Sequence, residues 1–111
     1  MDLKVVDVIG SQVALSPEPG YKLYKEIRDK IRQRENVVLD FIEVKILSTA
    51  FLNSAIGRLY SDFNSDQLND SLRIVNLADE DMSLLIRVIK RAKEYFKDKD
   101  SFDKKMEDRY E

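Results

Sequence analysis

The side chains that could do chemistry in this chain are hydroxyls and carboxylates, because the sequence contains neither cysteine nor histidine. Without cysteine there is no disulfide framework, thiolate metal site or thiol nucleophile. Without histidine there is no Ser-His-Asp triad, no imidazole ligand and no neutral-pH proton shuttle. We therefore expect no catalytic residue, no cofactor and no metal, and the composition favours a binding or structural domain over an enzyme.

Three short polar motifs precede apolar helical patterns, namely Ser16-Pro17, Ser48-Thr49 and Asp79-Glu80-Asp81. Each has two interpretations. Serine and threonine are common N-cap residues, so helix capping alone can explain the hydroxyls. The three acids suggest a cation site, but first-turn acids more commonly balance a helix dipole.

The composition limits the class of protein. The 111 residues suit one domain, and 19 basic against 21 acidic residues argue against nucleic-acid binding by bulk attraction. The longest charge-free run, residues 46–57, is far shorter than the roughly 20 apolar residues of a membrane helix. The first residues lack the basic and apolar regions of a secretory signal. Cytoplasm is the expected compartment.

Hydrophobic periodicity predicts the elements that hold these motifs. The expected elements are a strand over 3–9, a Gly10-Ser11 hairpin turn, a strand over 12–15, a helix near Gly20–Arg34, a strand over Val37–Ile42, a helix over Thr49–Phe63, a polar connector over 64–71, a strand over Leu72–Leu77 and a helix over Asp79–Phe96. The folded domain then covers residues 1–97. Residues 98–111 are densely charged and are expected to form a weakly packed C-terminal tail.

The order β-β-α-β-α-β-α predicts an α/β fold, a mixed four-stranded sheet covered by three helices. Strands that are separated by helices favour parallel pairing, and the initial hairpin adds an antiparallel edge. Ligands of open α/β sheets usually bind at the carboxyl ends of the strands, where these helices begin. The predicted partner-binding surface at this edge comprises Ser16, Pro17, Ser48, Thr49, Phe51, Asn53 and Asp79.

The segment VVLDFIEVKILSTAFLNSAIGRLY resembles the central part of STAS domains, the fold of bacterial anti-sigma factor antagonists. Leu39-Asp40 matches the end of the family's strand, and Ser48-Thr49 matches its Ser-Ser/Thr pair. The closer resemblance is to a divergent STAS-like family of unknown function, whose serine-containing link is followed by Phe and a Gly-containing helix, as in Phe51 to Gly57. The resemblance covers about residues 3–96.

This resemblance implies a signalling role. In the antagonists, an ATP-dependent anti-sigma kinase phosphorylates the first serine of the pair, which makes Ser48 the phosphorylation candidate and Thr49 its neighbour. Leu47 stands where the family has Asp, and Ala50 where it has Gly. The leading hypothesis is a non-enzymatic interaction domain for a protein partner, such as a histidine-kinase-like ATPase or an anti-sigma-like protein. The alternative is a small-molecule or nucleotide-sensing domain that uses the same edge. A homodimer is a further candidate interaction.

Overall fold

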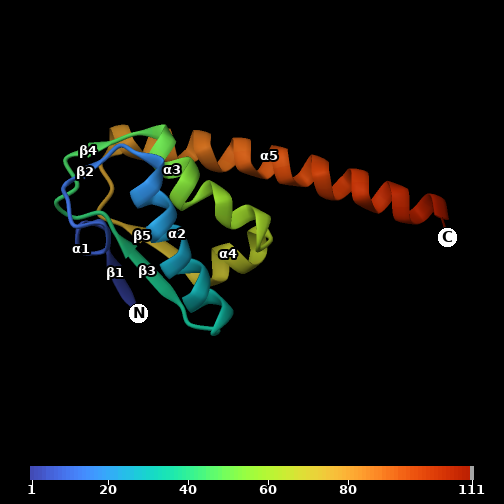
Figure 1. Ribbon diagram of the computed structural model, residues 1–111, viewed down its shortest axis with the longest axis horizontal. Coiled ribbons are helices and arrows are strands. Elements are labelled where there is room, and N and C mark those ends of the chain that lie inside the picture. Colours follow the sequence, from blue (N-terminus) through green and yellow to red (C-terminus); the bar gives the residue numbers. More distant parts are fainter. Residues whose placement is uncertain (111) are drawn as a thin grey trace.

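Short strands and helices alternate along the chain in the computed structural model, which describes the backbone of residues 1–110 and the side chains of residues 1–96. The elements are β1 (Asp2–Lys4), α1 (Val5–Ile9), β2 (Val13–Ala14), α2 (Pro17–Arg32), β3 (Val37–Asp40), β4 (Ile46–Leu47), α3 (Thr49–Ala55), the 3-10 helix η1 (Gly57–Ser61), α4 (Ser65–Ser71), β5 (Leu72–Val75) and α5 (Asp79–Tyr110). Figure 1 shows α2, α3 and α4 together on one side of the larger sheet, and α5 extending away from it.

The larger sheet has three parallel strands in the order β1-β3-β5. Leu3, Leu39 and Ile74 are aligned across the sheet and pack on the helices, with Leu39 fully buried. Because successive side chains of a strand alternate between faces, Asp2 and Arg73 lie on the opposite face, which is exposed. The predicted parallel pairing of Val37–Ile42 with Leu72–Leu77 is confirmed, since β3 and β5 pair in parallel.

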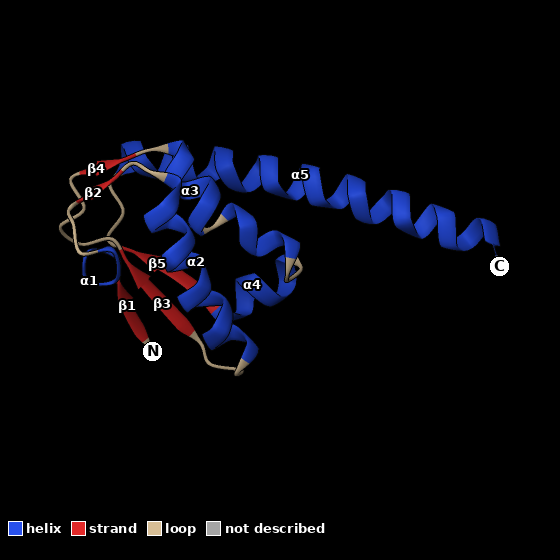
Figure 2. Ribbon diagram, viewed as in Figure 1, coloured by secondary structure: helices blue, strands red, loops and turns tan. Residues whose placement is uncertain are grey.

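A separate two-stranded parallel sheet, β2 paired with β4, lies beyond the end of the larger sheet (Figure 2). The prediction of one mixed four-stranded sheet with an initial hairpin is therefore wrong. The Val-rich run after β1 forms α1 instead of strand, and Gly10 ends this helix with φ of 71°, its N–H donating to Val6 O over 2.9 Å. A glycine in this left-handed conformation closes a helix as readily as it makes a hairpin turn.

The helices also differ from the three predicted ones in number and in bounds. The helix expected over Thr49–Phe63 is divided into α3 and η1, and α2 begins at Pro17, three residues earlier than expected. The polar connector over 64–71 forms α4. Asn64 and Gln67 build a capping box at its start, in which each side chain accepts from the other residue's backbone N–H.

The core lies between the larger sheet and the helices. Its fully buried large side chains come from every layer: Val5, Leu23, Ile27, Val37, Leu39, Phe51, Leu52, Ile56, Leu59 and Val88. Gly20 lets α2 approach α3, because a Cβ at that position would lie 2.7 Å from Phe51 O and 2.9 Å from Ser54 Cβ. Gly57 does not have this role, because a Cβ there would meet its nearest neighbour at 3.5 Å.

The C-terminal prediction lies largely outside the described residues. The backbone of α5 continues to Tyr110, while the side chains of residues 97–111 are not described, so weak packing of the tail stays a prediction. Within residues 1–110, no helix combines the length and the apolar composition that crossing a membrane requires.

Candidate functional site

The two-stranded sheet, which we call the ribbon (Val13–Ala14 and Ile46–Leu47), places two helix starts side by side. Val13 is aligned with Ile46 and Ala14 with Leu47. Each strand runs directly into a helix, β2 into α2 and β4 into α3. Because the strands are parallel and in register, the caps of both helices lie at the same end of the ribbon.

Ser48 joins the two strands at this end. Its Oγ donates to Leu15 O over 2.6 Å and accepts from Phe51 N–H over 3.1 Å. Its own N–H donates to Ala14 O over 3.1 Å. The predicted N-cap is therefore present, and the same hydroxyl also links α3 to the end of β2. The residue is half-buried, as is Thr49.

Ser16 is in the equivalent position before α2 but forms no side-chain cap hydrogen bond. It is exposed, and so is Pro17, the first residue of that helix. The carbonyl of Pro17 accepts a hydrogen bond of 2.7 Å from Ser54 Oγ, whose residue is only 6% exposed. Ser54 was not among the predicted site residues, because the sequence does not show that α3 crosses the start of α2.

The remaining predicted surface residues separate into two groups. Asn53 and Asp79 are exposed. Phe51 is fully buried in the core, so the structure removes it from the partner-binding surface. Its place in the first turn of α3 turns the ring inward while its N–H meets Ser48 Oγ. The three acids, including Asp79, form the first turn of α5, and no metal-competent cluster occurs in the described part of the chain.

The ribbon and Leu15, the residue after β2, form an exposed apolar face that is not among the predicted site residues. Val13, Leu15 and Ile46 are 43%, 45% and 49% exposed, whereas Ala14 between the first two is fully buried. This alternation is the pattern of a strand with one face outward. Because Val13, Ala14 and Leu15 are all apolar, the sequence does not show which of them face outward.

A different feature occupies the carboxyl ends of β3 and β5. Asp40 Oδ1 accepts from Asn76 Nδ2 and from Ile42 N–H, both over 2.9 Å. The Asn76 hydrogen bond, followed by the Ile42 N–H, lowers the pKa of Asp40 below its usual value, and Lys4 adds a smaller contribution. Asn76 has φ of 59°, a left-handed conformation that asparagine tolerates better than most residues.

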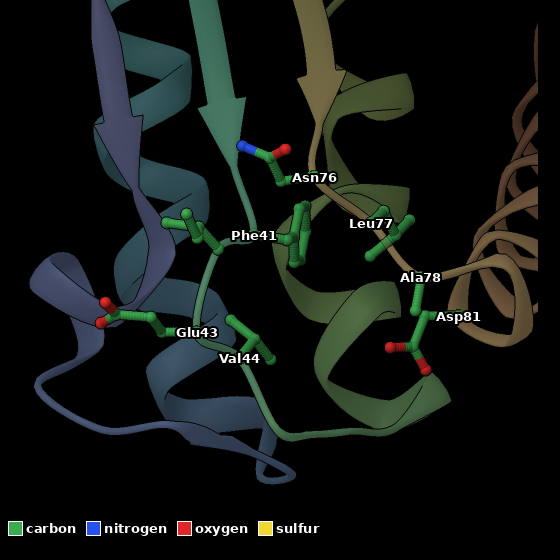
Figure 3. A pocket seen from close by; sticks show the side chains of 8 residues that line it. Phe41, Glu43, Val44, Asn76, Leu77, Ala78 and Asp81 are labelled. Atoms are coloured by element: carbon green, nitrogen blue, oxygen red, sulfur yellow. The ribbon is translucent and has the colours of Figure 1, made fainter.

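Beside this hydrogen bond lies a pocket of about 350 Å³ (Figure 3). Its charged lining residues, Glu43 and Asp81, are both acidic, and the others are Phe41, Ile42, Val44, Asn76, Leu77 and Ala78. Phosphate groups would be repelled by these carboxylates. The lining of this pocket therefore suits a neutral or cationic ligand better than a nucleotide.

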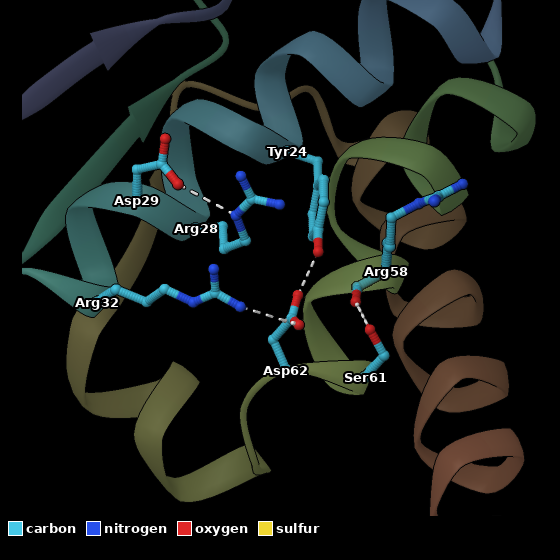
Figure 4. Close-up of polar contacts among 7 residues, drawn as sticks. All are labelled: Tyr24, Arg28, Asp29, Arg32, Arg58, Ser61 and Asp62. Atoms are coloured by element: carbon cyan, nitrogen blue, oxygen red, sulfur yellow. Dashed lines mark hydrogen bonds and ion pairs between the residues drawn. The ribbon is translucent and has the colours of Figure 1, made fainter.

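A polar cluster between α2 and η1 has a structural role (Figure 4). The Tyr24 hydroxyl donates a hydrogen bond to Asp62. Asp62 also forms an ion pair with Arg32, with 3.5 Å between Asp62 Oδ1 and Arg32 Nη2. Burial, with a further contribution from Asp62, raises the pKa of Tyr24 above its usual value. The tyrosine is therefore a neutral donor at physiological pH, and it fastens α2 to the segment after η1.

Comparison with protein families matches residues 20–82 to a STAS-like domain of unknown function (DUF4325). The match covers more than half of the chain, and the chain belongs to this family. It includes β3, β4, Ser48 and α3, the segment in which the sequence resembles STAS domains. No curated protein and no solved structure matches the chain.

Proposed function

We propose that this domain is a non-enzymatic interaction module that binds a protein partner through the ribbon. The observation that carries the proposal is the exposed apolar face of Val13, Leu15 and Ile46 beside the two helix starts. Although 36% of the chain is charged, residues 8–17 and 46–57, which form the ribbon and both helix starts, contain no charge. The cores of protein interfaces are depleted of charged residues in the same way.

The free energy gained by burying these three side chains indicates how large the contact with the partner must be. Full burial of a Val, Leu or Ile side chain is worth about 1.5–3 kcal/mol, and these three are already half-buried, so together they supply about 3 kcal/mol. Micromolar affinity corresponds to about 8 kcal/mol. The ribbon would therefore be the centre of a larger contact, with Ser16, Thr49 and Asn53 at its rim.

Ser48 is the proposed control point of this surface. A phosphate there would replace the hydroxyl proton that Leu15 O accepts and would add about 1.5 to 2 negative charges beside the apolar face. Both effects oppose partner binding, since the ribbon loses a link and the partner must desolvate a charge. By family resemblance, the partner would be a histidine-kinase-like ATPase or an anti-sigma-like protein.

Charge substitutions test the control point. Ser48→Asp cannot donate to Leu15 O, whereas Ser16→Asp adds the same charge nearby without breaking a hydrogen bond. We expect Ser48→Asp to weaken partner binding more than Ser16→Asp, and Ser48→Ala, which loses the same link but adds no charge, to weaken it only slightly. Equal binding by Ser48→Asp and the parent protein would remove the switch and leave Ser48 as a helix cap.

A photo-crosslinking residue tests the surface itself. Placed at Ile46, it should give a discrete adduct with one protein in cells of the source organism. Placed at Ile86, which is 60% exposed on α5, it should not. Adducts of equal yield from both positions would contradict the proposal. The captured protein is then purified for affinity measurements.

The alternative function, small-molecule or nucleotide sensing at the carboxyl edge, receives less support. The pocket at that edge has the volume of a small-molecule site, but its acidic lining suits a neutral or cationic ligand and opposes a phosphorylated one.

A further inference from the structure

A second groove, of about 550 Å³, lies between η1 and α5, and its charged lining is entirely basic. Its lining side chains include Asn53, Arg58, Ser61, Arg91, Tyr95 and Phe96. Small-molecule sites typically have volumes of about 300–1,000 Å³. The groove shares only Asn53 with the proposed partner surface.

Arg58 is held in place by aromatic rings. Its guanidinium carbon lies 5.0 Å from the centre of the Tyr21 ring and 5.7 Å from that of Tyr24. Such cation–π contacts restrain a guanidinium without neutralising it. Neither Arg58 nor Arg91 forms an ion pair with another residue of the described part of the chain. Both positive charges therefore remain available to a ligand.

The other side of the groove presents aromatic surface. Tyr95 is 68% exposed, and Phe96 meets its ring edge-on with the ring centres 4.8 Å apart. An exposed tyrosine ring held by a neighbour offers a face on which a flat ligand ring can stack. The groove thus combines two guanidiniums with a stacking surface.

We propose that this groove binds a small phosphate ester that carries a planar ring. The phosphate interacts with Arg58 and Arg91, because guanidinium groups match phosphate oxygens in charge and in hydrogen-bond geometry. The ring stacks on Tyr95. This site goes beyond the proposed partner binding and does not depend on it, since the ribbon and the groove use different residues.

The test is an NMR titration of the full chain, labelled with ¹⁵N, with phenyl phosphate, inorganic phosphate and phenol as probes. We expect saturable shifts of the Arg58 and Arg91 Nε–H signals with both phosphates, tighter binding of phenyl phosphate, and no such shifts with phenol. Shifts that are confined to the ribbon or spread evenly over the basic side chains would overturn the proposal.

Three variants separate the groove from general electrostatic attraction. Arg91→Gln should weaken phenyl phosphate binding by about tenfold, as expected for one charged hydrogen-bond partner. Arg87→Gln removes the same charge from an exposed position on the same helix outside the groove, and should change affinity by less than about twofold. Tyr95→Ala should reduce the affinity for phenyl phosphate to that for inorganic phosphate. Equal losses in the two arginine variants would overturn the site.

Discussion

The two parallel sheets of this domain are built from similar apolar segments and differ in what covers them. In the three-stranded sheet, Leu39 of the central strand is fully buried under the helices. In the ribbon, Val13 and Ile46 face outward and are nearly half exposed. The sequence of a strand therefore does not show by itself whether the strand belongs to the core or to a binding surface. The ribbon is a candidate binding surface because the domain leaves its apolar side chains uncovered.

Each sheet also has one polar link at its carboxyl end. Asp40 connects β3 to Asn76 after β5, and Ser48 connects β4 to Leu15 after β2. The first link uses a half-buried carboxylate beside an acidic pocket, whereas the second uses a half-buried hydroxyl beside an uncharged apolar face. A phosphate would therefore change the local charge at the ribbon, which has none, far more than at the larger sheet, where the pocket is already acidic.

Truncating one side chain in each sheet tests whether the two sheets differ in burial. Leu39→Ala removes a fully buried side chain and should lower the free energy of unfolding by about 2–5 kcal/mol. Ile46→Ser should lower it by about 1 kcal/mol, because about half of the side chain is buried. Urea denaturation measures both. A loss of more than about 2 kcal/mol for Ile46→Ser would show that the ribbon face is already covered.

The close packing of α2 against α3, the two helices that follow the ribbon strands, can be tested at Gly20, with Gly57 as a control. Gly20→Ala puts a Cβ against the backbone carbonyl of Phe51 and should cost about 1–3 kcal/mol, because α2 and α3 must move apart. Gly57→Ala meets only side chains at 3.5 Å or more and should be nearly neutral. Thermal unfolding of both variants measures the difference, and equal costs would contradict the close approach of these helices.

A smaller effect is expected at the two serine caps. Ser48→Ala loses a donor and an acceptor and should cost about 1 kcal/mol, whereas Ser16→Ala loses no side-chain hydrogen bond and should cost less than about 0.5 kcal/mol. Chemical denaturation of the pair checks this. Equal losses would show that the two helix starts are equivalent.

The weakest effect should be the pH dependence of the Asp40 link. A carboxyl whose folded pKa lies below its unfolded value of about 3.9 stabilises the fold above that pH, and this stabilisation is lost as pH falls through the folded pKa. Asn76→Gly keeps the left-handed backbone but removes the donor. A carbon-detected NMR titration should show the pKa of Asp40 rising toward its usual value, and an unchanged pKa would disprove the link.

Part of this architecture was predictable from the sequence, because local signals were strong there. The parallel pairing of β3 with β5 followed from a buried apolar segment separated from the next strand by a helical pattern. The Ser48 cap followed from its place before an amphipathic run. Asn64 and Gln67 have the spacing of a capping box, but the segment contains little apolar surface, so its sequence favours a connector over a helix.

The rest depends on contacts between distant segments. Residues 5–9 form a helix although Val and Ile favour strands, because β propensity depends strongly on structural context. The bond from Ser54 to Pro17 and the approach at Gly20 arise only once α2 and α3 are packed together. The exposed face of the ribbon and the basic groove are likewise properties of assembled surfaces, to which no local sequence pattern corresponds.

Whether the ribbon binds the partner is decided by the affinity of the purified partner, identified by crosslinking, for two serine variants of the domain. Ile46→Ser removes apolar surface from the ribbon, and Ile86→Ser removes the same side chain from the exposed face of α5. We expect Ile46→Ser to weaken partner binding by about tenfold, equivalent to about 1.4 kcal/mol, and Ile86→Ser to change it by less than about twofold. Equal affinities of both variants, or a greater loss at Ile86, would contradict the assignment of the ribbon as the partner-binding surface.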